Sequence, residues 1–242
     1  MRGVLIPVAD APQYESEAAV RFAEGWPEFI FHDAASSQWN SRRTEYFPDW
    51  EFYFTADDHL AAGCWGVPLA WDGTVADLPG GYTDSLARSV TSYEAGVVPN
   101  TFVLMAAAVL PEFRGTAAAL ITAVRDRAVA AGLGQVVAPL RPTWKPRYPL
   151  TPIETYATWT RPDGLPLDPW LRTHTRLGAT ILTPAPTSQT ITGSVADWET
   201  WTKMSFPTTG PYVIPAGLSV LHIDRSTNTG TYTEPNIWVR HA

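Results

Sequence analysis

Apolar residues run without interruption from Val103 to Leu110, and a helical pattern of apolar positions begins a few residues later. An unbroken run of this length predicts a strand that is buried on both faces of a sheet. Pro111 ends the run, and Gly115 allows the backbone to turn tightly. The first amides of the helix then point into the turn, where free N–H groups bind anions, above all phosphates. Arg114 adds a positive charge at the same place.

The helix after this turn carries apolar side chains on one face, at intervals of three and four residues. These residues are Ala117, Leu120, Val124, Ala128 and Ala131. The segment Ala-Gly-Leu-Gly at 131–134 is a typical helix end, and residues 135–140 form a second short apolar strand. This order and spacing is typical of a βαβ unit, so we expect the two strands to be parallel neighbours.

The first hundred residues predict a hairpin and several helices. Alternating residues indicate a strand at 50–54, a turn at 56–58 and a return strand from 59 to 71, with bulges at Gly63 and Gly66. The other expected elements are a strand at 3–8 and helices at 14–24, within 26–48 and at 82–95.

Residues 141–169 interrupt the regular pattern. They contain seven prolines among several aromatic residues, which is too irregular for a helix. Long ordered loops in compact domains are often functional, so this segment is expected to be a functional insertion. Asp168 can cap the helix that follows, Pro169 suits its first turn, and Leu177 and Gly178 end it.

Beyond this helix the pattern predicts only strands. Strand pieces are expected at 179–184, 190–206, 212–215 and 218–223, with a turn or bulge at Gly193 and Ser194 and an edge strand around Trp238. The chain shows no internal repeat and no interdomain linker. Residues 1–242 are therefore expected to form a single α/β domain with a mixed sheet.

The composition excludes several functions. The net charge of −7 and the lack of a basic run argue against nucleic-acid binding. No apolar run reaches the roughly 20 residues that span a membrane, and the first residues do not resemble a signal peptide. Cys64 is the only cysteine, so we expect a reducing compartment, the cytoplasm. The five histidines show no metal-ligand spacing, so no metal site is expected, and the nucleophile motif Gly-x-Ser-x-Gly does not occur.

The order of the elements and the motif after the buried strand resemble the GCN5-related N-acetyltransferase (GNAT) family. The family's acyl-CoA signature is Arg/Gln-x-x-Gly-x-Gly/Ala, usually preceded by Val-x-Pro. This chain has Val109-Leu110-Pro111, two residues, and then Arg114-Gly115-Thr116-Ala117-Ala118-Ala119. Ala117 stands where the family usually has Gly, and Ala still leaves the amide accessible. The alternative is an ordinary alanine-rich helix start, which the flanking βαβ pattern disfavours.

The resemblance implies a mixed, mostly antiparallel central sheet with flanking helices, the acyl-CoA N-acyltransferase fold. It also implies acetyl-CoA or another acyl-CoA as co-substrate, with its pyrophosphate on the amides from Arg114 to Ala119. The pantetheine arm would pair along the edge of strand 102–110, with the acyl carbonyl near the amide of Val109 or Leu110. Such a donor stabilises the charge that develops on the carbonyl oxygen during acyl transfer.

The same resemblance suggests the proton-transfer groups. The family often uses a Tyr on its last helix, four residues before the Gly that ends it, and this count gives His174. Histidine can act as acid or base at neutral pH, and packing on the helix is its alternative role. Tyr156, in the proline-rich loop, is a second candidate. A water chain or an already neutral amine would need no base. The nearest carboxylates are expected to be solvated: Glu94, Glu112, Asp197 and Glu199.

The acceptor pocket of this family is formed by the first helical region, the loop before the last helix and the last strands. In this chain those regions are rich in aromatic residues and poor in carboxylates, which favours an apolar or aromatic small-molecule amine. Packing in the core is the alternative role of these aromatic side chains. They are Trp26, Phe29, Trp39, Trp144, Tyr148, Trp159, Trp198 and Trp201.

The sequence therefore predicts an acyl-CoA-dependent N-acyltransferase, and specifically an N-acetyltransferase, whose acceptor amine attacks the thioester directly. One alternative is a CoA-thioester enzyme of the same fold with other chemistry, an O-acyltransferase or a decarboxylase. The other is a non-catalytic protein that binds CoA or another ligand. The acyl chain length and the oligomeric state stay open, with a homodimer as one alternative.

Overall fold

The computed structural model describes residues 3–241 of the chain. Within these residues nine strands form one sheet in the order β1-β2-β3-β4-β5-β9-β8-β7, and β6 pairs with β9. All neighbours are antiparallel except β4 and β5. The strands are β1 (Gly3–Pro7), β2 (Glu51–Ala56), β3 (His59–Leu69), β4 (Thr101–Val109), β5 (Gln135–Leu140), β6 (Thr180–Gly193), β7 (Gly210–Val213), β8 (Val220–Asp224) and β9 (Thr229–His241).

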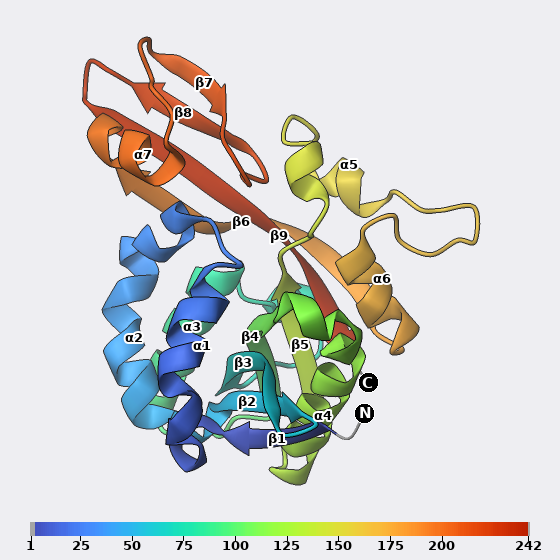
Figure 1. Cartoon of the computed structure of the whole chain (residues 1–242). Helices are drawn as coiled ribbons and strands as arrows, with labels where there is room; N and C mark the ends of the chain where they lie inside the picture. Colours follow the sequence, from blue (N-terminus) through green and yellow to red (C-terminus); the bar gives the residue numbers. More distant parts are fainter. Residues whose placement is uncertain (1–2, 242) are drawn as a thin grey trace.

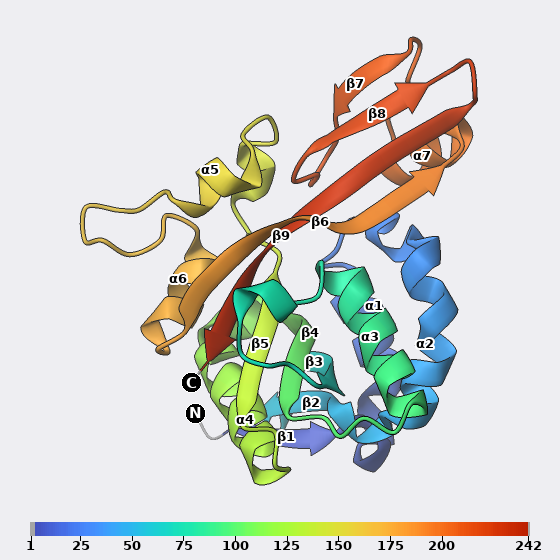
Figure 2. The same cartoon turned by 180° about the vertical axis from the view of Figure 1, so that it is seen from behind.

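Helices cover both faces of the first five strands. Leu86 and Val90 of α3 pack on one face, and Leu120 and Val124 of α4 pack on the other. Figures 1 and 2 show α1, α2 and α3 grouped on one side of the molecule and α4 on the other. The helices are α1 (Glu15–Ala23), α2 (Ala34–Tyr46), α3 (Tyr82–Glu94), α4 (Ala117–Ala130), α5 (Ile153–Ala157), α6 (Pro169–Arg176) and α7 (Val195–Thr202). Mixed α/β architecture with a mostly antiparallel sheet is therefore confirmed.

The two parallel strands separate soon after they pair. β4 and β5 are in register only over residues 101–103 and 135–137. Beyond Val103, and within the described residues, β4 has no strand partner on that edge, whereas β5 continues beside residues 237–241 of β9. The apolar run thus forms a strand whose second half leaves one edge of its backbone free for a ligand.

A bulge in the hairpin partner of β4 lies close to this separation. The register between β3 and β4 shifts between Trp65 and Gly66, which confirms the bulge expected at Gly66. A Cβ atom at Gly66 would lie 2.3 Å from the carbonyl oxygen of Val103, so no larger residue fits. The bulge expected at Gly63 was wrong, because the register is regular there on both edges of β3. A Cβ atom at Gly63 would lie 2.4 Å from the ring of Phe22, which explains the small residue.

The C-terminal third forms a long ribbon that carries a second small core. Figure 1 shows β6 and β9 running diagonally past the first five strands towards β7, β8 and α7. Trp198 of α7 packs there with Tyr232 of β9 and Phe29 of the 3-10 helix η3 (Glu28–His32). β9 pairs with three strands, so the prediction of an edge strand around Trp238 was wrong.

Two further sequence predictions need correction. The region 190–206 is not all strand, because Ser194 and Asp197 form a capping box that starts α7. The proline-rich segment 141–169 does contain a helix, the short α5, which Pro152 immediately precedes.

No helix within residues 3–241 has both the length and the apolar character needed to cross a membrane. The assignment of residues 1–242 to a single domain stays a prediction.

Candidate functional site

A cavity of about 1110 Å³ lies beside the free edge of β4. Every residue from Leu104 to Leu110 contributes to its wall. The wall continues over α1 and the segment after it, over the end of β5 and over one face of α6. Arg114 and Ala117 close the end next to α4. The cavity therefore connects the split between β4 and β5 with the start of the predicted phosphate-binding helix.

The hydrogen bonds of β4 show which of its amides face this cavity. The amide of Leu110 donates to the carbonyl oxygen of Ala61 at 2.9 Å, so it points towards β3. Successive amides of a strand point to opposite edges, and the register from Ala106 to Val109 is regular. The amides of Val109 and Ala107 therefore point to the open edge. Of the two amides predicted to contact an acyl carbonyl, that of Leu110 is already occupied and that of Val109 is free.

The turn between β4 and α4 has the features of an anion site. It forms the 3-10 helix η6 (Pro111–Thr116), and Thr116 is the N-cap of α4 but gives its hydroxyl to the carbonyl of Phe113. No side chain caps α4, and its first turn contains no acidic residue. A Cβ atom on Gly115 would meet no atom within 4 Å. Open space above an uncapped helix start allows an anion to approach the amides.

Two arginines set the charge at this end of the cavity. Arg114 is exposed and forms no ion pair among residues 3–241. Arg21 of α1 lies in the cavity wall and donates to Glu112 at 2.5 Å and to Glu17 at 3.0 Å. The hydrogen bond from Arg21 lowers the pKa of Glu112. Arg21 thus neutralises Glu112, the one carboxylate on the turn. The charge of Arg114 is therefore available to attract an anionic ligand.

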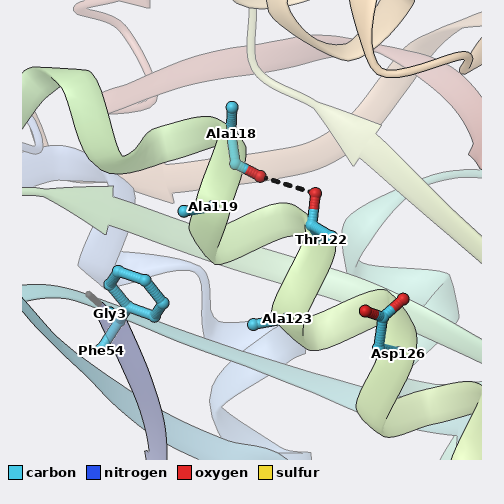
Figure 3. A pocket seen from close by; sticks show the side chains of 7 residues that line it. All are labelled: Gly3, Phe54, Ala118, Ala119, Thr122, Ala123 and Asp126. Carbon is cyan, nitrogen blue, oxygen red and sulfur yellow. Dashed lines mark hydrogen bonds between the residues drawn. The ribbon is translucent and has the colours of Figure 1, made fainter. Parts of the chain in front are cut away.

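The predicted cofactor residues do not all face the same space. Val109, Leu110, Arg114 and Ala117 line the main cavity. Ala118 and Ala119 line a separate groove of about 390 Å³ between α4 and the first two strands, which Figure 3 shows with Phe54 facing α4. The groove wall includes Thr122, whose hydroxyl donates to the carbonyl of Ala118 at 2.9 Å. Gly115 and Thr116 belong to neither wall.

His174 is fully buried on the face of α6 that points away from the cavity. Its Nδ1 atom lies 2.7 Å from Nε2 of His241, and its ring packs edge-on against Trp170. Burial lowers the pKa of His174 to about 3, and His241 contributes to this shift. The ring is therefore neutral at physiological pH. The catalytic role assigned to His174 stays a prediction, and the geometry does not favour it.

Tyr156 is likewise buried and lies outside the cavity wall. Its hydroxyl donates to Asp168 at 2.8 Å, and burial raises the pKa of Tyr156, with Asp168 adding to the shift. Asp168 also accepts the amides of Trp170 and Leu171 as the N-cap of α6. Tyr156 thus joins α5 to the start of α6, which is a structural role, and its assignment as a second proton donor stays a prediction.

Several polar residues of the cavity wall were not among the sequence predictions. Thr173 of α6 lines the cavity, together with Pro169 and Trp170. The helical spacing of these three residues, with Leu171 and His174 on the buried face, was the signal that could have revealed it. The other missed groups in the wall are Glu15, Glu24, Glu51, Arg141, Thr143, Gln189 and Asn236.

The carboxylates in the wall differ in their partners. Glu15 and Glu24 on and after α1 form no ion pair among residues 3–241. Glu51 at the start of β2 accepts from Arg43 at 3.0 Å. The four carboxylates named from the sequence lie outside the wall, and each accepts a hydrogen bond from another residue. They are Glu94, Glu112, Asp197 and Glu199. Among residues 3–241 no group of three or more His, Cys, Asp or Glu side chains is arranged to hold a metal ion.

The aromatic residues expected around the acceptor mostly serve the core. Trp26 lines the cavity, whereas Phe29 and Trp198 are buried in the small C-terminal core. Other aromatic side chains take their place in the wall. They are Phe22, Phe31, Phe52, Tyr53, Trp65, Tyr82 and Trp170. The cavity therefore has aromatic walls together with acidic and basic groups.

Comparisons with known proteins agree with this geometry. No family model matches the chain. The arginine N-acetyltransferase avaD of Aspergillus versicolor is 29% identical over 245 residues, which cover 89% of this chain and 84% of that protein. The loading GNATL domain of CurA from Lyngbya majuscula has a TM-score of 0.57 at 16% identity, covering 100% of this chain and 98% of that one. The GphF GNAT-like decarboxylase, solved with isobutyryl-CoA, has a TM-score of 0.54 at 19% identity, covering 100% and 99%.

Proposed function

We propose that the chain is a GCN5-related N-acetyltransferase that transfers an acetyl group from acetyl-CoA to the amine of a small molecule. The supporting observation is the free edge of β4 over residues 104–109, which borders a cavity that reaches the uncapped start of α4. A thioester arm can pair with that edge while its phosphates bind at the helix start.

Acetyl-CoA is held mainly by backbone in this proposal. Its pyrophosphate lies on the turn around Gly115 and the first amides of α4, next to Arg114. The pantetheine arm pairs with the outward amides of Ala107 and Val109. These amides also offer a donor to the acyl carbonyl, which gains negative charge as the amine attacks. The acyl-CoA is a co-substrate, and acetyl is the acyl group that the arginine N-acetyltransferase relative suggests.

One side chain is assigned to the proton transfer. The amine nitrogen forms a bond to the thioester carbon and loses a proton to a base; the carbon–sulfur bond then breaks, and CoA leaves as a thiolate that takes a proton from solvent. We assign the proton acceptor to Glu24, which lines the cavity beside Trp26 and has no ion-pair partner within the described residues. Thr173 lies in the same wall on α6, and its hydroxyl donates to the carbonyl oxygen of Pro169 at 3.0 Å, so its oxygen can accept a hydrogen bond from the acceptor amine and hold it in place.

The acceptor is a small amine that contacts both aromatic and charged groups. Trp26, Phe31 and Tyr82 offer apolar surface for an apolar or aromatic portion, as the composition predicted. Glu15 and Glu51 lie in the same wall and suit a basic group, and the relative's acceptor, arginine, carries one. A cytoplasmic location and a homodimer stay predictions.

Thiol release from acetyl-CoA over a panel of small amines tests this function, with mass spectrometry of the acetylated product. Stabilisation of the protein by CoA in a thermal melt tests the binding step separately. Formation of an N-acetyl product would support the proposal. Stabilisation by CoA without any N-acetyl product would contradict the transferase activity and favour a binding protein or another thioester reaction.

A further inference from the structure

One cation of the cavity wall is held in place by a buried carboxylate on a distant strand. Arg141 follows β5 directly, and its Nε atom donates to Oε1 of Glu234 at 2.5 Å, across 93 residues of sequence. Its Nη2 atom donates to the carbonyl oxygen of Ala216 at 2.6 Å. The Glu234 side chain is 1% exposed, whereas that of Arg141 is 18% exposed and belongs to the cavity wall.

The sheet creates the space for this pair. β5 and β8 lie on the same edge of β9, but β5 stops opposite Ile237 and β8 stops opposite Tyr232. Residues 233–236 therefore have no strand partner on that edge within the described chain. Arg141 reaches Glu234 through this gap, and Asn236 in the same gap also lines the cavity.

The geometry of Arg141 leaves one donor group for a ligand. With Nε and Nη2 occupied, Nη1 has no hydrogen-bond partner among residues 3–241, and it is not among the buried atoms that lack a partner. A guanidinium held by two fixed acceptors loses little rotamer entropy when it binds a third group. Nη1 is therefore a preorganised donor at the cavity surface.

The local charge is positive. Lys145 is 1% exposed and donates to the carbonyl oxygens of Tyr148 and Leu218, and its charge acts on Glu234. Burial lowers the pKa of Lys145 to about 8, so it is still mainly protonated at pH 7. Arg141 and Lys145 together then outnumber the single carboxylate of Glu234, and the cluster keeps a positive charge near Nη1. An anion in the cavity would neutralise it.

We propose that Arg141 binds a carboxylate of the acceptor, so that the preferred acceptors are amines that also carry a free acid group, such as amino acids. This inference rests on the proposed N-acetyltransferase function and specifies its acceptor class. The carboxylate lies at the β5–β9 end of the cavity, next to Asn236. Arg114 and Arg21 lie by the α4 end, where the phosphates of the co-substrate bind. Arg141 is then a specificity residue and not a catalytic one.

Matched acceptor pairs test the inference. L-arginine is compared with L-argininamide and L-tryptophan with L-tryptophanamide, each by kcat/KM from thiol release with acetyl-CoA. The wild type should favour the free acids. Removal of Arg141 should reduce the acid-to-amide ratio by about 10- to 100-fold, the effect of losing a charge-assisted hydrogen bond. The ratio between protein variants cancels the intrinsic reactivity of each amine.

The variants are chosen to keep the fold. Arg141→Gln alone leaves Glu234 buried without its cation, so the double variant Arg141→Gln/Glu234→Gln is measured beside it. Arg88→Gln is the matched control, because Arg88 also pairs with a carboxylate, Asp77, and a backbone carbonyl, that of Ala70, but lies outside the cavity wall. The control should keep the wild-type ratio.

Each possible result of these measurements either supports or contradicts the proposed carboxylate site at Arg141. An unchanged ratio in the double variant would overturn it. A raised KM for acetyl-CoA with an unchanged ratio would also overturn it and assign Arg141 to a co-substrate phosphate. N-acetylation of the amides together with a ratio that the loss of Arg141 does not change would refute the acceptor class while leaving the N-acetyltransferase function intact. No thiol release with any amine would instead refute the proposed function, and the inference with it.

Discussion

Nδ1 of His174 on α6 lies 2.7 Å from Nε2 of His241 at the end of β9. Both rings are buried, and the remaining nitrogens, Nε2 of His174 and Nδ1 of His241, have no hydrogen-bond partner within the described residues. A buried pair of this kind is stable only while both rings are neutral, because a charge there would be unsolvated. His174 was predicted as a catalytic group by counting back four residues from Gly178. In the structure it connects α6 to β9.

This pair should make the fold sensitive to mild acid. Burial lowers the pKa of His174 to about 3 and that of His241 to about 4. The unfolded chain binds protons near pH 6.5, so stability is full above that pH and falls as the pH decreases towards the folded values. A single histidine with such a shift costs roughly 3 kcal/mol of unfolding free energy by pH 4. Denaturant unfolding between pH 7.5 and 4 measures the loss.

The double variant His174→Gln/His241→Gln lacks the titrating groups and should show a flatter stability profile between pH 6.5 and 4. His222→Gln, at an exposed position of β8, is the control and should follow the wild type. A double variant whose profile is as steep as that of the wild type would show that other groups, not this pair, cause the acid sensitivity.

Thr173 and His174 of α6 should differ in their effects on the rate and on the stability. Thr173→Val removes the hydroxyl oxygen that is assigned to the acceptor amine and should lower kcat/KM for the acceptor by about tenfold. His174→Gln should lower the melting temperature but leave kcat within a factor of about two, because the ring does not reach the cavity. Steady-state kinetics and thermal melts of both variants measure this. A large loss of kcat in His174→Gln with normal stability and CoA affinity would return His174 to the mechanism.

Reversing the charge of Arg114 should weaken CoA binding. Arg114→Glu places a carboxylate beside the uncapped start of α4, where phosphates are expected, so Kd for CoA should rise at least about tenfold. Arg127→Glu makes the same change in the last turn of the same helix and should bind CoA normally. Calorimetry on both variants compares them. Equal affinities would move the phosphates away from the start of α4.

Glu24→Gln should impair deprotonation of the acceptor. Loss of a general base lowers the rate by about a hundredfold or more, and the deficit should shrink as the pH rises and the amine becomes neutral by itself. Glu45→Gln, at an exposed position of α2 outside the cavity wall, is the control and should retain activity. The pH dependence of kcat/KM checks this. A uniform loss at every pH would indicate that Glu24 binds the acceptor and does not take its proton.

Tyr156→Phe should test the structural role of that tyrosine. The change removes the buried hydrogen bond to Asp168 and should cost about 1–2 kcal/mol of unfolding free energy. It leaves the cavity wall unchanged, so kcat should be preserved. Urea unfolding and steady-state rates measure the two effects. Lost activity at unchanged stability would support the proton-donor role predicted from the sequence.

The local parts of the site were predictable from the sequence. The apolar run, Pro111, Gly115 and the helical spacing after them are short-range signals, and they define the β4–turn–α4 unit that carries the acyl-CoA signature. Their physical basis is local, because turn residues and the period of apolar positions fix the backbone over a few residues. The free amide of Val109 also followed from the resemblance, although the occupied amide of Leu110 did not.

The groups that face the acceptor depended on the tertiary structure. Thr173 faces the cavity and His174 does not because α6 packs against the end of β9, and Arg141 is fixed only because Glu234, 93 residues later, lies in a gap on the edge of β9. A pattern of apolar positions predicts which residues are buried, but not which distant strand supplies their neighbours. The sequence by itself therefore determined the β4–turn–α4 unit, which we propose binds the donor. The acceptor side was decided by the pairing of β9 with β5, β6 and β8, because long-range strand register alone brings those side chains together.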